Sequence, residues 1–333
     1  EQEIYQKILT EKGTFTQYKK SLKFLIDLLA RVNQKKVVVL IDEYDTPIHA
    51  AYQNGYYKEM IDFMRGFLSG GFKDNLHLQK GVLTGILRVA KESIFSGFNN
   101  AVVYTLLDSS FSEYFGFTQE EVDQLLKDFN LEDRRDEVQT WYNGYWFGNK
   151  RVIYNPWSVS HYVAHPDALA KAYWINTSDN VLIRDLILQS TLPEIQEGVD
   201  ALLRGQSIES PLEESLVLRD MAASSQSIWS WLTFSGYLKP ALLRREGSDN
   251  DIVVYRLTVP NVEVRTFFRN TVQSWLDERI GSSQLQQLLK ALVKGDLDLF
   301  EDYLSDFVVS FLSYHDVQGD APERVYQAFV LGL

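Results

Sequence analysis

Residues 35–45 read KKVVVLIDEYD, in which five consecutive aliphatic residues lie between two lysines and an acidic end. The three valines are β-branched, and an unbroken apolar run of this length predicts a strand buried on both faces inside a parallel sheet. The run ends in Asp42 and Glu43. Ligands of open α/β sheets bind just beyond the carboxyl ends of the strands, so we expect chemistry at this pair of carboxylates.

An apolar strand that ends in Asp-Glu is the Walker B pattern of P-loop nucleotide hydrolases. In that pattern Asp42 holds Mg²⁺ and Glu43 polarises the attacking water. Acidic turns are common after strands, so the motif alone leaves open a purely structural turn. A two-metal phosphohydrolase cluster of Asp42, Glu43 and Asp45 is disfavoured, because three carboxylates on one turn do not readily bracket two ions. Asp45 also suits a turn-forming or capping role.

The composition indicates a soluble, cytoplasmic globular protein. The chain has 333 residues, 45% of them hydrophobic, no cysteine and a formal charge of −12. These values allow two or three domains and exclude disulfides and thiolate metal sites. No apolar window is long enough for a membrane helix, and the first residues lack the pattern of a signal peptide. The acidic charge disfavours general electrostatic wrapping of nucleic acid.

A second strand is predicted at residues 76–84, after a helix over 56–72; another helix, over about 15–33, precedes the first strand. A helix between two strands implies a right-handed parallel crossover, which would make the strands neighbours and place Thr84 near Asp42. A polar residue at this position often senses the γ-phosphate in P-loop ATPases. Thr84, Arg88 and Lys91 are the candidates, although Arg88 and Lys91 also suit an ordinary solvated face.

Helical patterns dominate the sequence after residue 110. An aromatic hairpin is predicted within residues 141–159, where a packing role is favoured over nucleobase stacking because basic residues are not interleaved. Residues 225–279 read as a helix, a hairpin and a second helix, which is how a winged-helix module ends. The hairpin tip carries Asp249 and Asp251, which disfavours DNA reading.

Several motifs occur together in a fixed order along the chain, and they are far more specific than the Walker B run alone. They are VVVLIDEYDTP at 37–47, LTG at 83–85, SIFSG at 93–97, WYNGY at 141–145, YNP at 154–156, SGYL at 235–238 and PNVEVR at 260–265. With this set the chain resembles the predicted AAA-ATPase-like family, whose members usually carry a PD-(D/E)XK nuclease-like domain after the ATPase part. The resemblance covers nearly the whole chain. It implies that Asp42 and Glu43 form the Walker B and that Thr84 with Arg88 occupies the sensor-like position.

The resemblance predicts an α/β fold with an incomplete P-loop-type parallel sheet, a helical region and a winged-helix-like unit. The expected domains are the ATPase-like core at 1–109, a helical extension with the aromatic hairpin at 110–222, the winged-helix-like unit at 223–282, and a helical linker with the first nuclease-like helix at 283–333. The family's Gly-Lys-Ser phosphate loop is expected before residue 1, and no Gly-Lys-Ser or Gly-Lys-Thr occurs in the chain. The acidic and lysine residues of the nuclease-like domain are expected after residue 333, so the chain reads as a fragment.

The intact parent is therefore expected to bind and hydrolyse ATP with Mg²⁺ and to control the nuclease-like domain, which could engage a partner protein or nucleic acid. The 333-residue chain itself is expected to be inactive, with no cofactor bound. The alternative is a non-enzymatic scaffold or partner-binding module on a degenerate ATPase fold, with the aromatic hairpin and the wing as its contact surface. The substrate and the oligomeric state stay open.

Overall fold

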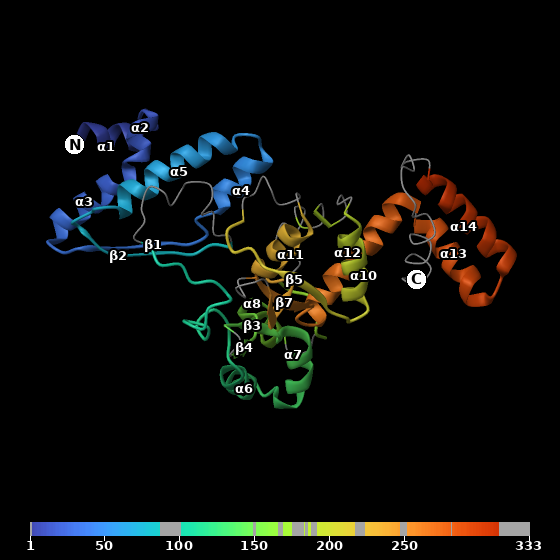
Figure 1. The fold of residues 1–333 in the computed structure, drawn as a ribbon. Helices are drawn as coiled ribbons and strands as arrows, with labels where there is room; N and C mark the ends of the chain where they lie inside the picture. Colours follow the sequence, from blue (N-terminus) through green and yellow to red (C-terminus); the bar gives the residue numbers. More distant parts are fainter. Residues whose placement is uncertain are drawn as a thin grey trace. The chain divides into compact units, whose positions relative to one another are not determined.

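A computed structural model gives the structure of residues 2–86, 101–148, 151–165, 169–174, 183, 186–187, 192–216, 224–246, 252–280 and 282–312 (Figure 1). The chain divides into two compact units. The first comprises Glu1–Ser110 and Pro211–Gly236, and the second comprises Phe111–Ser210 and Tyr237–Leu333. The fold is mixed α/β, with many helices and three small sheets in the described residues.

The first unit begins with three helices. Their bounds are α1 Gln2–Leu9, α2 Phe15–Lys19 and α3 Ser21–Asn33. The single helix predicted over 15–33 is thus divided at Lys20. Thr14 starts α2 with a capping box, since its hydroxyl accepts from the backbone N–H of Gln17 while the Gln17 side chain accepts from the Thr14 N–H.

The parallel pair predicted around the carboxylates is present. Strands β1 (Val37–Ile41) and β2 (Leu78–Leu83) pair in parallel, and the crossover between them contains α4 (Thr46–Gln53) and α5 (Tyr57–Phe72). Helix α5 was predicted, whereas α4 was missed because Thr46-Pro47 reads as a break after the strand. The proline stands in the first turn of α4, where its missing N–H costs no hydrogen bond.

The prediction that β1 is buried on both faces is wrong. Helices α3 and α5 contact the strands (Figure 1), and alternate β1 residues beginning with Val37 are half-buried. Val38 is 50% exposed and Leu40 is 73% exposed. Successive side chains of a strand point to opposite faces, so the helices cover one face of this two-stranded sheet and leave the other open. Residues 102–106, a possible further strand, have no regular structure.

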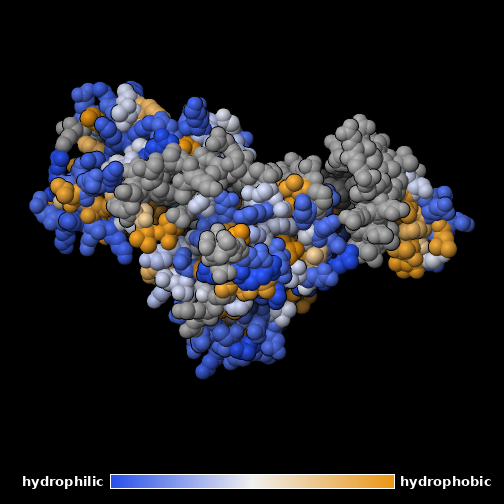
Figure 2. Space-filling model, in the orientation of Figure 1, coloured by the Kyte–Doolittle hydropathy of each residue, from blue (hydrophilic) through white to orange (hydrophobic). Residues whose placement is uncertain are grey.

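Helix α3 also keeps an apolar face accessible. The exposed apolar residues follow the first of them by three, four and seven positions, which places them on one side of the helix. They are Leu25, Leu28, Leu29 and Val32. Figure 2 shows hydrophobic surface over the N-terminal helices, at the upper left of the view. The same helix buries Ile26 and Ala30 on its opposite side. The apolar spacing of the sequence therefore predicted the helix correctly but not which positions are covered, because neighbouring apolar positions differ in exposure.

The first unit also contains α11 (Ser225–Phe234), the first of the two helices predicted within residues 225–279. Its residues 227–233 are all buried. The ring of Trp231 lies 5.5 Å from the ring of His49 on α4, measured between centroids. Helix α11 thus packs, through Trp231, against the helix that directly follows the carboxylate turn.

The second unit begins with helices around a tyrosine-rich core. Its first elements are α6 Gln119–Asp128, η2 Glu132–Arg134, α7 Arg135–Tyr142, β3 Tyr145–Phe147, β4 Arg151–Ile153 and α8 Pro156–Val163. Thr118 and Asn155 cap α6 and α8, since their side chains accept hydrogen bonds from backbone N–H groups of the first turn. The core includes Tyr142, Tyr154 and Tyr162, each almost fully buried. Much of the aromatic segment therefore packs inside the unit.

The remaining elements of the second unit are α10 Pro193–Leu203, β5 Ile208–Pro211, β6 Lys239–Glu246, β7 Ile252–Thr258, α12 Val262–Ile280, α13 Ser282–Lys294 and α14 Leu297–Leu312. The β6–β7 hairpin was predicted, but β5 was not. Strand β5 lies beside β7 and gives a three-stranded sheet with the order β5-β7-β6. The winged-helix assignment stays a prediction. Its acidic tip lies outside the described residues, as do residues 313–333 of the segment expected to contain the first nuclease-like helix. No helix in the described part of the chain is long and apolar enough to cross a membrane.

Candidate functional site

The carboxyl ends of β1 and β2 are held together by backbone hydrogen bonds. The Thr84 N–H donates to the Ile41 carbonyl at 2.9 Å, and the Tyr44 N–H donates to the Thr84 carbonyl at 3.0 Å. These two bonds continue the parallel ladder beyond the last strand residues. Residues 42–44 and residue 84 therefore form one fixed turn at the sheet edge where ligands of open α/β sheets bind.

Two of the predicted site residues meet in this turn. The Thr84 hydroxyl donates a hydrogen bond to Oδ1 of Asp42. The Glu43 N–H lies 3.1 Å from the same Asp42 oxygen and 3.4 Å from the Thr84 hydroxyl oxygen. The structure thus brings Asp42 and Thr84 together as the crossover predicts, while their roles in binding stay predictions.

Glu43, the predicted water-activating residue, has a left-handed backbone with φ of 50°. Few residues other than glycine adopt this conformation, and it costs about 1–2 kcal/mol for a residue with a Cβ. The side chain of Glu43 bends toward α4, where the Thr46 hydroxyl donates to Oε2 at 3.2 Å. Thr46 was not selected from the sequence, although a hydroxyl three residues after a carboxylate is a common local pairing.

The third carboxylate of the turn lies in the interior. Asp45 is only 2% exposed, and its Oδ2 lies 3.7 Å from Nε2 of His49, one turn later on α4. Burial lowers the pKa of His49, and the charge of Asp45 partly opposes that shift. Asp45 is thus a packed residue at the N-cap position of α4, but its side chain makes no capping hydrogen bond there, so only its place in the turn matches the expectation.

Gly85 makes room for the buried carboxylate. A Cβ at this position would lie 2.6 Å from Oδ1 of Asp45 and 2.8 Å from Cε1 of Tyr44. Both distances are shorter than van der Waals contact, so any side chain would displace one of these groups. The sequence motif LTG at 83–85 gave no sign of this steric role.

The exposed part of the turn suits a hard cation. Asp42 offers an accessible carboxylate and Thr84 a hydroxyl oxygen, and Mg²⁺ prefers oxygen ligands of these kinds while keeping several waters. Among the described residues, no three His, Asp or Glu side chains form a group that could hold a metal ion. Asp42, Glu43 and Asp45 therefore do not gather as a two-metal cluster requires. The other sensor candidates, Arg88 and Lys91, lie outside the described residues.

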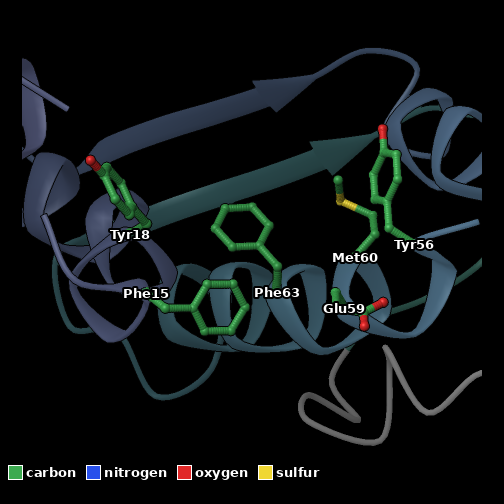
Figure 3. A pocket seen from close by; sticks show the side chains of 6 residues that line it. All are labelled: Phe15, Tyr18, Tyr56, Glu59, Met60 and Phe63. Atoms are coloured by element: carbon green, nitrogen blue, oxygen red, sulfur yellow. The ribbon is translucent and has the colours of Figure 1, made fainter. Parts of the chain in front are cut away.

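An open groove lies elsewhere in the first unit. It has a volume of about 360 Å³ and is lined by Phe15, Tyr18, Tyr56, Glu59, Met60 and Phe63 (Figure 3). Figure 3 shows rings from α2 and from the N-terminal half of α5 along an open, largely apolar groove. None of its lining residues belongs to the carboxylate turn, so the groove is not the site of the predicted chemistry.

Residues 2–95 match the sequence model of a family described as predicted AAA-ATPase, called AAA-ATPase-like. The match includes β1, the carboxylate turn and Thr84.

The chain is also similar to an uncharacterized protein in the vnfD 5' region of Azotobacter chroococcum mcd 1. The two are 27% identical over 303 residues, which cover 89% of this chain and 54% of the relative. The chain thus spans about half the length of that relative. No solved structure matches the 333-residue chain. The family match supports an AAA-ATPase-like domain over residues 2–95 of this chain.

Proposed function

We propose that the first unit is the magnesium- and nucleotide-sensing part of an ATPase. In this proposal Asp42 helps to hold Mg²⁺ and Glu43 polarises the water that attacks the γ-phosphate. Thr84 senses whether the γ-phosphate is present. The observation that carries it is the hydrogen bond between the Thr84 hydroxyl and the Asp42 carboxylate at the carboxyl ends of two parallel strands. The family match over residues 2–95 supports the same assignment.

The donor set supports this arrangement. Mg²⁺ would neutralise charge on the β- and γ-phosphate oxygens of ATP. Asp42 carries the exposed carboxylate suited to it, and the Thr84 hydroxyl keeps that carboxylate at the end of β1. Glu43 follows in the chain with a separate carboxylate, so holding the ion and orienting the water fall to different residues. Arg88 is proposed as a further contact to the transferring phosphate.

The phosphate-binding loop of the site is proposed to come from sequence outside the 333 residues, because no Gly-Lys-Ser or Gly-Lys-Thr occurs within them. Backbone N–H groups and the lysine of such a loop supply most contacts to the β- and γ-phosphates. The chain alone is therefore expected to bind Mg-ATP weakly or not at all. The whole protein is proposed to couple ATP hydrolysis to a C-terminal nuclease-like domain.

Two measurements test the proposal. Isothermal titration of the 333-residue chain with Mg-ATP should give no low-micromolar binding. A low-micromolar dissociation constant would contradict the proposed location of the phosphate loop.

In the full-length protein, Glu43→Gln should abolish steady-state ATP hydrolysis while Mg-ATP still binds, because the amide cannot take a proton from water. Wild-type turnover by this variant would remove Glu43 from the catalytic role.

The scaffold alternative is less well supported by the side-chain positions. Its expected contact surface includes the aromatic hairpin, and Tyr145, Trp146 and Phe147 of β3 are all partly buried within the second unit. The ring of Phe147 stacks on Phe115 at 6.3 Å between centroids. Partly buried rings offer less surface to a partner than exposed ones, so the ATPase proposal is the one that these observations favour.

A further inference from the structure

We propose that Thr46 is a positioning residue that holds the Glu43 carboxylate in the orientation needed to engage the attacking water. This inference rests on the proposed ATPase function of the carboxylate turn. Its observation is the hydrogen bond from the Thr46 hydroxyl to Oε2 of Glu43 at 3.2 Å. A general base is effective when a third group fixes its orientation, as in catalytic triads.

The backbone of Glu43 prepares this contact. With φ of 50°, Glu43 lies in the bend that follows β1, and the Thr46 N–H donates to the Glu43 carbonyl at 3.1 Å. The side chains of residues 43 and 46 therefore meet over one tight turn. A left-handed residue other than glycine is uncommon, and such conformations concentrate at functional sites where the surrounding structure fixes them.

Helix α4 fixes the hydroxyl in space. Thr46 is its first residue, and the helix is anchored by Ile48 and Ala51, both fully buried, and by the buried Asp45 that precedes it. Thr46 and Glu43 are themselves exposed. The hydroxyl thus stands on a rigid element while the carboxylate that it binds remains accessible to water.

The hydrogen bond uses one oxygen of the carboxylate. Oε2 accepts from Thr46, and Oε1 remains to accept a hydrogen bond from a water molecule. Without the hydroxyl, the Glu43 side chain would sample several rotamers, and each misplaced conformer would reduce the fraction of turnovers in which the water is aligned. Thr46 thus acts through Glu43 and need not touch nucleotide.

The first experiment compares steady-state ATP hydrolysis by full-length variants. Thr46→Val keeps the shape of the side chain but removes the donor, and we expect kcat to fall about tenfold with KM within about twofold. Thr46→Ser should retain most of the activity. Thr10→Val is the control. Thr10 is also exposed, and its hydroxyl donates to the backbone carbonyl of Gln6 in α1 instead of to a carboxylate.

The outcomes separate this inference from the proposed function. If Glu43→Gln abolishes turnover and Thr46→Val leaves kcat unchanged, the positioning role is wrong while the ATPase proposal stands. If Glu43→Gln turns over ATP at the wild-type rate, the proposed function itself fails. An equal loss of kcat in Thr46→Ser and Thr46→Val would overturn the role of the Thr46 hydroxyl.

A second readout needs no nucleotide. In the 333-residue chain, urea unfolding of Thr46→Val, Glu43→Ala and the double variant forms a double-mutant cycle. The hydrogen bond predicts a coupling of about threefold or more in the unfolding equilibrium constant, because the second substitution has no bond left to break. Strictly additive effects would overturn the contact between these two side chains.

Discussion

The hydroxyl of Thr84 donates a hydrogen bond to the carboxylate of Asp42, a residue 42 positions earlier in the chain. The two residues follow adjacent parallel strands, so this side-chain bond joins the carboxyl ends of β1 and β2. It adds to the backbone hydrogen bonds between Ile41, Tyr44 and Thr84 at the same ends. The contact orients the exposed carboxylate and fixes the distance between the two strand ends. It therefore links stability of the first unit to geometry of the candidate site.

Thr84→Val should lower the free energy of unfolding by about 1 kcal/mol, because the half-buried Thr84 loses its hydrogen bond to the exposed Asp42 carboxylate. Thr84→Ser keeps the hydroxyl and should lose little of that stability. Urea unfolding of the 333-residue chain measures both, with Thr10→Val as the control for removing an exposed hydroxyl. Equal midpoints for wild type and Thr84→Val would contradict the contribution of the Asp42 contact.

Gly85→Ala should destabilise the first unit by about 1–3 kcal/mol, because the added methyl group would overlap Oδ1 of Asp45 and the Tyr44 ring. Gly70→Ala in α5 is the matched control. Its Cβ would meet only the Lys19 carbonyl at 3.7 Å, an ordinary contact, and alanine favours the helix. A thermal melt that moved down equally for both variants would contradict the specific role of Gly85.

The sequence predicted the parallel pair and the approach of Thr84 to Asp42, because an apolar run and a handed crossover leave little choice of topology. It did not predict the exposure of Val38 and Leu40. An apolar strand reads the same whether one or both faces are covered, and coverage depends on how many elements surround it.

The details of the turn could not be predicted for a different reason. The contact of Thr46 with Glu43 depends on a left-handed φ at a glutamate, which residue preferences disfavour. The steric role of Gly85 depends on where the buried carboxylate of Asp45 lies. Strand β5 was missed because residues 208–211, IESP, are short and contain a proline, which weakens any strand pattern.

Acidification should destabilise the first unit through His49. Burial lowers the pKa of His49 in the folded protein, with Asp45 opposing the shift. In the unfolded chain histidine titrates near 6.5, so as the pH falls below about 6.5 the unfolded state takes up a proton first and the free energy of unfolding decreases. His49→Phe, which keeps a ring beside Trp231, should remove this decrease between pH 7.5 and pH 5.5.

The measurement is the urea midpoint at both pH values. His165→Phe is the control, since His165 is exposed and belongs to the other unit. The His49→Phe midpoint should change less between the two pH values than the wild-type midpoint does. If wild type and His49→Phe show the same pH dependence, the protonation of His49 is not coupled to folding.

Glu263 is the strongest candidate for a polar anchor of the second unit. It is fully buried, and its carboxylate accepts from the Ser158 hydroxyl at 2.8 Å and from the N–H groups of Tyr173 and Trp174 at 2.6 and 2.8 Å. Burial, followed by the charge of Glu263, raises the pKa of Tyr173. The carboxylate thus joins α12, α8 and the segment at 173–174, three parts of the chain that no sheet connects.

Glu263→Gln should therefore lower the free energy of unfolding by about 2–3 kcal/mol, because the amide loses the negative charge and places a donor among donors. Glu120→Gln, at the exposed start of α6, is the matched control and should change stability by less than about 1 kcal/mol. Urea unfolding of the 333-residue chain, followed by tryptophan fluorescence, reports the difference, since the backbone N–H of Trp174 is one of the donors to Glu263. Similar midpoints for the two variants would mean that the three donors are equally satisfied by an amide, and the charge of Glu263 would then contribute nothing to this core.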